Sequence, residues 1–518
     1  MRRQREKLLA ILLAGTVVLS GCTSHRGEVE PTATPVPTAT PTAPPAPVAE
    51  GAGFALPYSP TAGFHPITGA NRLNLTFAPL LYQGLFSLYQ SFGVKNDLCE
   101  SYTVSEDGLV WTFVLAEATF SDGEPLTAAQ VTASLNQARR SERYAARLAD
   151  VIRVSGREGN EVTVTLSRPN GALPALLDVP IVKETVDPMR PLGTGAYVLT
   201  EEEGGIYLLA REGADLPLDR IPLRSVGASD DLVYAFDAGE ISLVDTDLLG
   251  TNMPGYSGRL ETTDYPTSDL LYVGCNTQKG ACEDPLVRRA LSLAWNRREL
   301  VREILMDHAV ASALPIHPKA SGYEADGAVM SVTDDRDGAA GLLAQAGWSP
   351  DEEGHLLKRK NQLTLRLVVN QENTFKVSMA GALGRALEEL GCVVTVDKLP
   401  WDDFVAALKA GNFDLYLGET VLTADFDPYV LVGTDGELNY GGYESRELDA
   451  LMDSYRAAQG EARMRAASTL WNKLGEEAPI IPLCFKNGSV LTQWGQVMGM
   501  TPTQQNVFFG FDNWNIRQ

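Results

Sequence analysis

Residues 363–417 carry the clearest architectural pattern in the chain, LTLRLVVNQENTFKVSMAGALGRALEELGCVVTVDKLPWDDFVAALKAGNFDLYL. Leucine or valine stands at every second position from 363 to 369, which is the period of a β-strand. The pattern predicts strands at 363–369, 392–396 and 413–417 and helices at 375–390 and 401–410. Gly391 and Gly411 follow the two helices, where glycine commonly ends a helix. Strands and helices that alternate at this spacing imply right-handed crossovers and a parallel sheet.

Polar residues occupy or follow the carboxyl ends of these predicted strands. They are Asn370, Gln371, Glu419 and Asp425. In parallel sheets ligands collect beyond the carboxyl ends of the strands, where helix starts and loops leave a crevice. The sequence therefore predicts a ligand site at this edge.

Antiparallel β structure is predicted nearer the N-terminus. Residues 104–115 hold an Asp-Gly turn followed by β-branched and aromatic residues, a hairpin signature, and residues 161–166 alternate as a further strand. Thr127 and Gln130 match a capping box that begins a helix, and Asp284 before Pro285 begins another. The fold class is therefore α/β with a β-rich part.

The size and composition of the chain fit a folded protein of several parts. At about 150 residues per domain, 518 residues suggest roughly three units, or two lobes with an added subdomain. Forty-four per cent of the residues are hydrophobic and 21% are charged, so most of the chain can bury a core.

The chain is acidic, with 66 Asp and Glu against 43 Lys and Arg and a net charge of −23. A net negative charge of this size repels the phosphate backbone and disfavours binding to nucleic acid. It either favours cationic solutes or serves only colloidal solubility, and the sequence leaves both open.

The N-terminus predicts a secreted and lipid-anchored protein. Residues 1–7 carry four basic side chains, and the apolar run 8–20 is too short for a standard spanning helix, as in a signal peptide over residues 1–21. Leu19-Ser20-Gly21-Cys22 resembles the lipobox of bacterial lipoproteins, which implies that Cys22 is lipidated and becomes the new N-terminus. Residues 31–48 contain only Pro, Thr, Ala and Val, so the segment 22–50 is predicted to be an extended tether.

The five cysteines after Cys22 do not suggest a disulfide framework, because an odd number prevents complete pairing. Cys275 and Cys282 are close enough in sequence to bridge, but buried free thiols are the favoured interpretation. The state of this pair stays open.

Catalytic, metal and nucleotide motifs were not found in the sequence. Gly255-Tyr256-Ser257-Gly258 lacks the second glycine of a nucleophile elbow, since Arg259 stands there. The five histidines form no HExxH motif, and no phosphate-binding GxxxxGK[ST] loop occurs. We therefore expect no enzyme activity, no metal site and no cofactor.

Several segments together resemble the extracytoplasmic solute-binding proteins of the peptide/nickel ABC importer family, across roughly residues 54–516. The segments are LYQGL (81–85), FSDGEPLT (120–127), GTGAY (193–197), GEI (239–241), NT (276–277), DPLVRRAL (284–291) and LLAQAGW (342–348). Two departures leave the fine ligand preference open. Ala116 stands where the family usually has arginine, and residues 417–421 lack the family's Gly-Trp pair.

The resemblance implies a two-lobed periplasmic-binding-protein-like fold (type II, cluster C) with an extra β-rich subdomain. Lobe I would comprise residues 51–83, 184–265 and 489–518, the inserted subdomain residues 84–183, and lobe II residues 266–488. Two segments would cross between the lobes, which close over the solute.

The resemblance also implies a set of solute-binding residues. Asp425, in Ala424-Asp425-Phe426, matches a family aspartate that neutralises a peptide α-ammonium group. Glu419 is its rival, because a short insertion is needed to align Asp425, and an ordinary loop aspartate is the alternative. Trp401 would form an apolar wall or pack in the core. The other positions implied to border the cleft are Asn71, Arg72, Asp245, Thr246, Asp247, Tyr272 and Asn439.

We therefore expect a monomeric, extracytoplasmic, lipid-anchored receptor that binds an oligopeptide or dipeptide-like solute and delivers it to an ABC permease. Alternatives are another amine-bearing or metal-chelate solute, a solute sensor without a transport role, and an extracytoplasmic hydrolase. The sequence does not give the identity, length or affinity of the solute, or the resting state of the cleft.

Overall fold

The computed structural model describes residues 53–517 except 157–158, 203–204, 252 and 324–330. It confirms the predicted strand and helix order in the C-terminal half. Strands β17 (Thr364–Asn370), β18 (Val393–Leu399) and β19 (Leu415–Val421) alternate with helices α8 (Thr374–Glu389) and α9 (Trp401–Lys409). β17 pairs in parallel with both β18 and β19, so the predicted parallel arrangement is correct.

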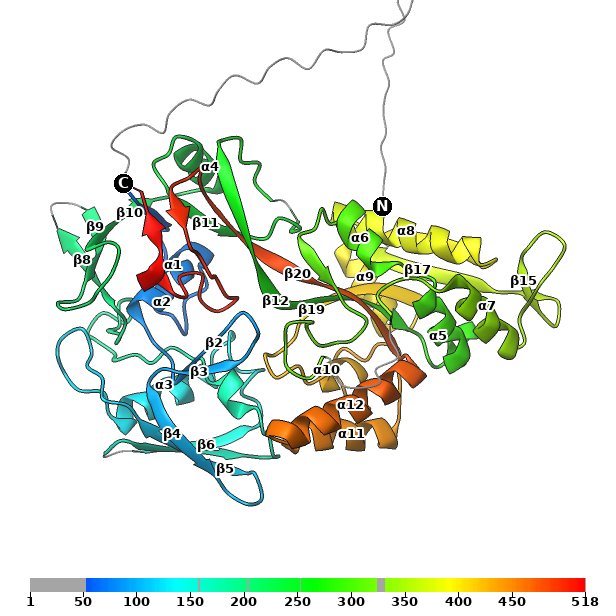
Figure 1. Cartoon of the computed structure of the whole chain (residues 1–518), viewed down its shortest axis with the longest axis horizontal. Coiled ribbons are helices and arrows are strands. Elements are labelled where there is room, and N and C mark those ends of the chain that lie inside the picture. Colours follow the sequence, from blue (N-terminus) through cyan, green and yellow to red (C-terminus); the bar gives the residue numbers. More distant parts are fainter. Residues whose placement is uncertain (1–52, 157–158, 203–204, 252, 324–330, 518) are drawn as a thin grey trace, which may run out of the picture. The chain divides into compact units, whose positions relative to one another are not determined.

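These strands form one edge of a larger mixed sheet, whose order is β11-β20-β12-β19-β17-β18, with β13 paired to β20. The added strands are β11 (Leu243–Thr246), β12 (Leu260–Cys275), β13 (Ala309–Ala311) and β20 (Ile480–Gln493). β12 and β20 are long antiparallel strands that run through the middle of the molecule in Figure 1. Both strands contribute residues to two hydrophobic cores, one around β12 and β19 and one in the N-terminal part of the chain.

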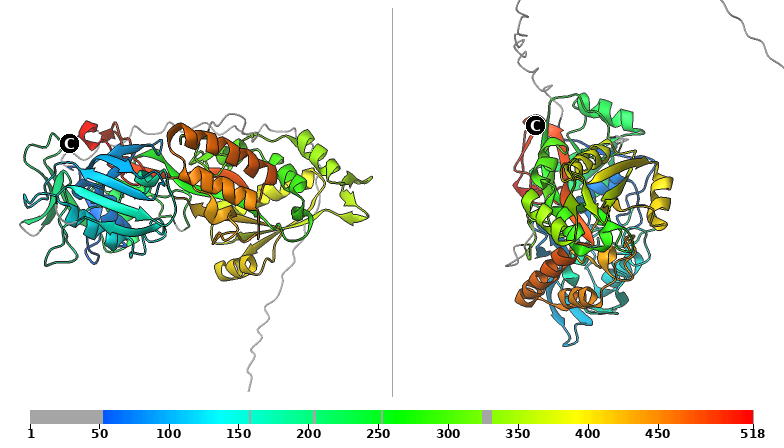
Figure 2. Two further views of the ribbon diagram at one scale, coloured as in Figure 1. Left: turned by 90° about the horizontal axis from the view of Figure 1, so that it is seen from below. Right: turned by 90° about the vertical axis from the view of Figure 1, so that its right-hand side faces the viewer.

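The core around β12 and β19 has two layers, one on each face of the sheet, because successive strand residues point to opposite faces. Leu271 and Val273 face one layer, together with α5, α7 and α8, and Leu270 and Tyr272 face the other, with α11 and α12. Helices α11 and α12 lie side by side in Figures 1 and 2. The helices of this part not yet bounded are α5 (Pro285–Leu293), α6 (Arg297–Glu303), α7 (Arg336–Gln345), α10 (Tyr429–Val432), α11 (Arg446–Ala457) and α12 (Gly460–Glu477).

A second core is built by the N-terminal part of the chain and its last residues, and it includes Phe54, Trp111, Tyr197 and Trp514. Two four-stranded sheets contribute to it, in the orders β1-β10-β9-β8 and β4-β5-β7-β6. Their strands are β1 (Leu56–Tyr58), β4 (Cys99–Val104), β5 (Val110–Leu115), β6 (Val151–Ser155), β7 (Glu161–Leu166), β8 (Tyr197–Glu202), β9 (Gly205–Ala210) and β10 (Arg220–Ser225).

The predicted local elements of this region are confirmed. β4 and β5 form the expected hairpin, and β7 is the expected strand. The main-chain N–H of Thr127 donates to the Gln130 side chain at 3.0 Å, at the start of α3 (Ala128–Ala138), as a capping box requires. The remaining elements are α1 (Arg72–Thr76), α2 (Ala78–Leu81), α4 (Ser229–Asp237), β2 (Phe86–Leu88), β3 (Val94–Asn96), β14 (Ser349–Pro350), β15 (Leu356–Lys358), β16 (Asn361–Gln362), β21 (Val497–Met498) and β22 (Asn515–Ile516), with short 3-10 turns at Leu173–Leu176, Ala281–Glu283 and Phe511–Asn513.

The predicted domain boundaries stay a prediction. The names lobe I, subdomain and lobe II refer to the predicted residues 51–83, 184–265 and 489–518, residues 84–183, and residues 266–488. The predicted signal peptide, Cys22 and the tether lie outside the described residues.

The five described cysteines are all buried and free, as the sequence favoured, and Cys275 and Cys282 are not bridged. Burial raises the pKa of the Cys275 thiol to about 12, which keeps it protonated and unreactive. Among the described residues, none of the helices has the length and apolar composition to cross a membrane, and no cluster of His, Cys, Asp and Glu could hold a metal ion.

Candidate functional site

A buried lysine that the sequence pattern did not point to contacts two of the predicted site residues. The side chain of Lys486 on β20 is only 5% exposed. Its Nζ lies 2.7 Å from Asp247 Oδ2, 2.8 Å from Glu419 Oε1 and 3.3 Å from Asp269 Oδ2. Two of the predicted residues, Asp247 and Glu419, are thus brought together by this one ammonium group, although they lie far apart in the sequence.

An irregularity in β12 aims Asp269 at this lysine. Pro266 pairs with Asn487 and Leu270 pairs with Phe485, so residues 267–269 bulge out opposite Lys486 alone. The Thr267 hydroxyl holds the bulge by donating to the Lys486 carbonyl at 2.7 Å. Bulges commonly re-aim a side chain at a functional site.

Lys376 on α8 completes the group by an ion pair with Glu419. We call these five residues the Lys486 cluster: Asp247, Asp269, Lys376, Glu419 and Lys486. It holds three carboxylates and two ammonium groups, so it carries one surplus negative charge when all of them are ionised.

The pKa values of Asp269 and Glu419, two of the acids beside Lys486, are shifted in opposite directions. Burial and the negative charge of Glu419 raise the pKa of Asp269 to about 7, against the attraction of Lys486. Burial also opposes ionisation of Glu419, but the charges of Lys376 and Lys486 outweigh it and lower the pKa of Glu419 to about 2. The surplus negative charge is therefore offset by a proton on Asp269 below neutral pH.

This arrangement predicts a pH dependence of stability. Asp269 has an ordinary pKa of 3.8 and a folded pKa of about 7, so between these values the folded state holds a proton that the unfolded state releases. The free energy of unfolding should therefore fall as the pH rises from about 4 to 7. Asp269→Asn should flatten this slope, measured by urea unfolding at pH 5 and pH 8. The pKa of Glu419 in the folded state lies below its ordinary value of 4.5. The contribution of Glu419 to the free energy of unfolding therefore changes at lower pH than that of Asp269. An unchanged slope in the variant would contradict the assignment to Asp269.

Arg72 and Asp245, two further predicted residues, meet beside β11. Arg72 Nη2 lies 3.0 Å from Asp245 Oδ2, and the Tyr265 hydroxyl donates to Asp245 Oδ1 at 2.6 Å. The side chain of Arg72 is still 55% exposed, which leaves donors free for a solute carboxylate. Asn71 caps α1 by accepting the Asn74 N–H, and Thr246 is buried in β11.

Trp401 begins α9 and is 58% exposed, so it does not pack in the core. Its ring lies against Phe404 at 6.0 Å between centroids, and its main-chain N–H donates to Glu372. An exposed indole at the carboxyl edge of the parallel strands fits the apolar wall that the resemblance implied.

Tyr272 and Asn439 are not among the side chains gathered at Lys486. Tyr272 is 2% exposed in the core, where its hydroxyl lies 3.4 Å from that of Tyr416 and burial raises its pKa to about 12. Asn439 donates to the carbonyls of Gly433 and Tyr443 and accepts from the Tyr443 N–H, which orders its own loop. Solute contact by these two residues stays a prediction.

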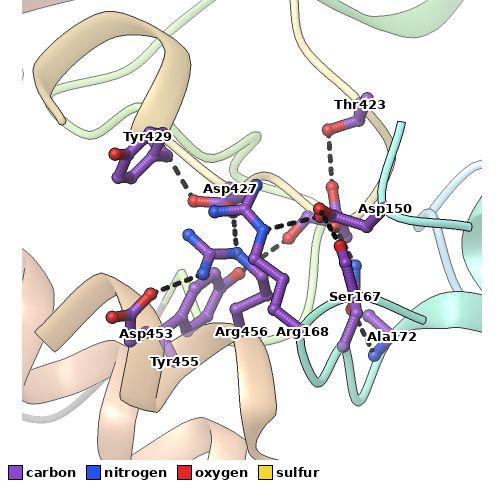
Figure 3. Close-up of polar contacts among 12 residues, drawn as sticks. Asp150, Ser167, Arg168, Ala172, Thr423, Asp427, Tyr429, Asp453, Tyr455 and Arg456 are labelled. Carbon is purple, nitrogen blue, oxygen red and sulfur yellow. Dashed lines mark hydrogen bonds and ion pairs between the residues drawn. The ribbon is translucent and has the colours of Figure 1, made fainter. Parts of the chain in front are cut away.

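Asp425 lies in a different environment, in contact with Thr423 and Tyr455, two residues that Figure 3 labels. It is 6% exposed, and its carboxylate accepts from Thr423 Oγ1 at 2.5 Å and from Asn170 Nδ2 at 2.9 Å. A contact between Asp425 and a solute amine also stays a prediction.

The residues that sequence reasoning missed are Asp269, Lys376 and Lys486. Lys486 had a usable signal, because it is a single charge inside the apolar run IIPLCFK of residues 480–486. A lysine at a buried strand position needs carboxylate partners. Asp269 had no comparable signal, since its position depends on the β12 bulge.

Comparison with known proteins gives a consistent result. Residues 93–441 match the family model of bacterial extracellular solute-binding proteins, family 5. The oligopeptide-binding protein AppA of Bacillus subtilis is 22% identical over 458 residues, which cover 82% of this chain and 84% of AppA.

Solved structures share the fold. The periplasmic murein tripeptide binding protein MppA, in an unliganded open form, has a TM-score of 0.74 at 19% identity over 90% of this chain and 98% of its own. NikZ of Campylobacter jejuni, in complex with Ni(L-His), has a TM-score of 0.62 at 19% identity over 89% of this chain and 98% of its own. These likenesses confirm the expected two-lobed α/β fold.

Proposed function

Since this chain belongs to the family 5 bacterial extracellular solute-binding proteins, we propose that it captures a peptide or peptide-like solute with a free amine and passes it to an ABC permease. The family consists of extracytoplasmic substrate-binding proteins of ABC importers and not of enzymes. We also propose that the solute is an amine-bearing peptide, that the permease is the partner, and that the protein is a monomer with a lipid anchor.

The Lys486 cluster is the observation that supports this solute class. When Asp269 is ionised, it places one surplus negative charge where β11, β12, β19 and β20 meet, next to the ion pair of half-exposed Arg72 with Asp245. The side chains of Glu419 and Asp247 are 20% and 32% exposed, so they retain open lone pairs. A solute ammonium group would balance the surplus charge, Arg72 would bind a carboxylate, and Trp401 would cover apolar side chains.

A second candidate is a solute in which a metal chelate supplies the positive charge. It is favoured by the likeness to NikZ, whose structure holds Ni(L-His). In that case the same surplus negative charge would face the chelate.

Native mass spectrometry of the purified protein would identify the solute and separate these candidates. The added solute should then stabilise the folded state by RT ln(1 + [L]/Kd), about 2.7 kcal/mol at a hundredfold excess over Kd. Thermal unfolding with increasing solute checks this. If neither a broad peptide library nor metal–histidine chelates shift the unfolding temperature, the proposed solute class is wrong.

The lipobox predicts a second outcome. Cys22→Ala should release the protein from membranes, because the cysteine that carries the lipid is lost. Fractionation of cells, with mass spectrometry of the mature N-terminus, measures this. A variant that stays in the membrane with unaltered mass would contradict the anchor, while Cys99→Ala, which removes a buried thiol, should leave membrane retention unchanged.

A further inference from the structure

The Asp269 and Glu419 side chains of the Lys486 cluster lie on the same face of two neighbouring strands. We infer that these two acids share one proton when the protein holds no solute, and that an ammonium group of the solute takes the place of this proton. Asp269 is then a specificity-determining residue, because it accepts the positive charge only as the proton leaves to the solvent. The inference rests on the proposed function and names the charge that the solute must bring to this cluster.

The register of β12 against β19 places the two acids together. Asp269 pairs with Val421, and Leu271, two positions on, pairs with Glu419. Asp269 and Glu419 are therefore diagonal neighbours on one face of the sheet, within reach of each other. Burial raises the pKa of Asp269 most, and the charge of Glu419 and a hydrogen bond between the two side chains raise it further. Two carboxyl groups can form such a bond only when one of them carries a proton.

One oxygen of Asp269 supports the shared proton independently. Oδ2 lies 3.3 Å from Lys486 Nζ, whereas Oδ1 is buried and has no hydrogen-bond donor among the described residues. A buried carboxylate oxygen without a donor raises the free energy of the folded state, because it has lost its hydration. A proton shared with Glu419 removes this penalty, since Oδ1 then belongs to a neutral carboxyl group.

The groups around the pair keep the number of bound protons at one. Burial opposes the charge of Lys486, but the carboxylates beside it outweigh burial and raise its pKa, so it stays an ammonium. Burial and the two acids raise the pKa of the Cys484 thiol, so it stays neutral. With one proton, the charges of the cluster therefore sum to zero. In the part of the chain that the structure describes, the titratable groups facing the pair are Lys486 and Cys484 on β20, Asp247 after β11 and Lys376 on α8.

A neutral cluster cannot take up a solute ammonium without losing its proton. The added charge would leave one uncompensated positive charge among largely desolvated groups, which is costly. Loss of the proton to the solvent restores neutrality, so the ammonium and the proton exclude each other. The side chains of Asp269, Glu419 and Asp247 are 18%, 20% and 32% exposed, which leaves them accessible to a solute. The predicted solute contact of Asp425 is separate from this exchange and stands unchanged.

Infrared spectroscopy of the solute-free protein at pH 6 tests the shared proton. Asp269→Asn should remove about one protonated carboxyl group per molecule from the spectrum, because the pair holds its proton at this pH. Asp230→Asn is the matched control. Asp230 is exposed in the first turn of α4, and its substitution should leave the protonated-carboxyl absorption unchanged. The same absorption in Asp269→Asn and the unsubstituted protein would overturn the inference.

Calorimetry tests the exchange in the unsubstituted protein. The probe is the free-amine peptide without titratable side chains that raises the unfolding temperature most in a peptide library at pH 7, and its N-acetylated form is the control. The pKa of Asp269 is about 7, so the affinity should rise at least about tenfold from pH 5 to pH 7, while the ammonium of the probe stays charged. Heats in two buffers of different ionisation enthalpy should show about one proton released per peptide bound at pH 6. The N-acetylated peptide should release none.

The outcomes separate this inference from the proposed function. In Asp269→Asn the affinity for the probe should change by less than about twofold between pH 5 and pH 7, because the exchangeable proton is gone. A probe that binds the unsubstituted protein equally at both pH values and releases no proton would overturn the exchange, while the proposed function would stand. If no free-amine peptide binds at either pH, the proposed solute class is wrong and the exchange falls with it, whatever the infrared spectrum shows.

Discussion

Lys486→Met should lower the free energy of unfolding by about 3–5 kcal/mol at pH 7, because it leaves the three largely desolvated carboxylates of the cluster with Lys376 as their one cation. Lys486 is 5% exposed and bonds Asp247, Asp269 and Glu419 at once. Methionine fills a similar volume, so the loss reports the missing charge and not a cavity. Urea unfolding followed by circular dichroism measures it.

Lys95→Met is the matched control. Lys95 lies 3.3 Å from Asp97, but its side chain is 47% exposed, and exposed pairs contribute under about 1 kcal/mol. The cost of Lys486→Met should also shrink at pH 4, where the carboxylates can take up protons. A loss below about 1 kcal/mol at pH 7 would show that the buried lysine is not the cation on which the cluster depends.

Trp401→Ala should weaken binding of the identified solute by roughly 30-fold or more, about 2 kcal/mol, as exposed aromatic anchors do when they are removed. Folding should be spared, because the ring is 58% exposed and, within the part of the chain that the structure describes, contacts one other aromatic ring, that of Phe404. Isothermal titration calorimetry gives the affinity, and thermal unfolding without solute confirms the fold.

Trp494→Ala controls for the general loss of a surface indole. Trp494 is 51% exposed and follows the end of β20, eight residues beyond Lys486, which is about 26 Å along an extended strand. Its removal should leave the affinity within about twofold, since residues outside a binding patch contribute little. Equal effects of the two substitutions would remove Trp401 from the proposed site.

Local pattern was sufficient to predict the elements around residues 363–417. Alternating leucines, two glycine stops and helix-period spacing depend only on neighbouring residues, and the structure confirms β17, α8, β18, α9 and β19 from them. The capping box at Thr127 and the hairpin of β4 and β5 are confirmed for the same reason.

The order of motifs along the chain was sufficient for the family and the two-lobed fold, which the comparisons confirm. The position of the site was partly predictable too. Asp247 follows β11, Asp245 and Glu419 lie near the carboxyl ends of β11 and β19, and strand ends gather where a sheet leaves a crevice.

Only the tertiary structure decided which of these side chains meet. Lys486 contacts Asp247 across 239 residues of sequence, and Asn170 contacts Asp425 across 255. The contacts of Lys486 depend on the register of β12 against β20 and on a bulge that turns Asp269 toward Lys486. One residue of slip would move each side chain to the opposite face of the sheet. The sequence alone therefore determined the elements and the family, whereas register, set by packing of the whole core, decided which charges pair.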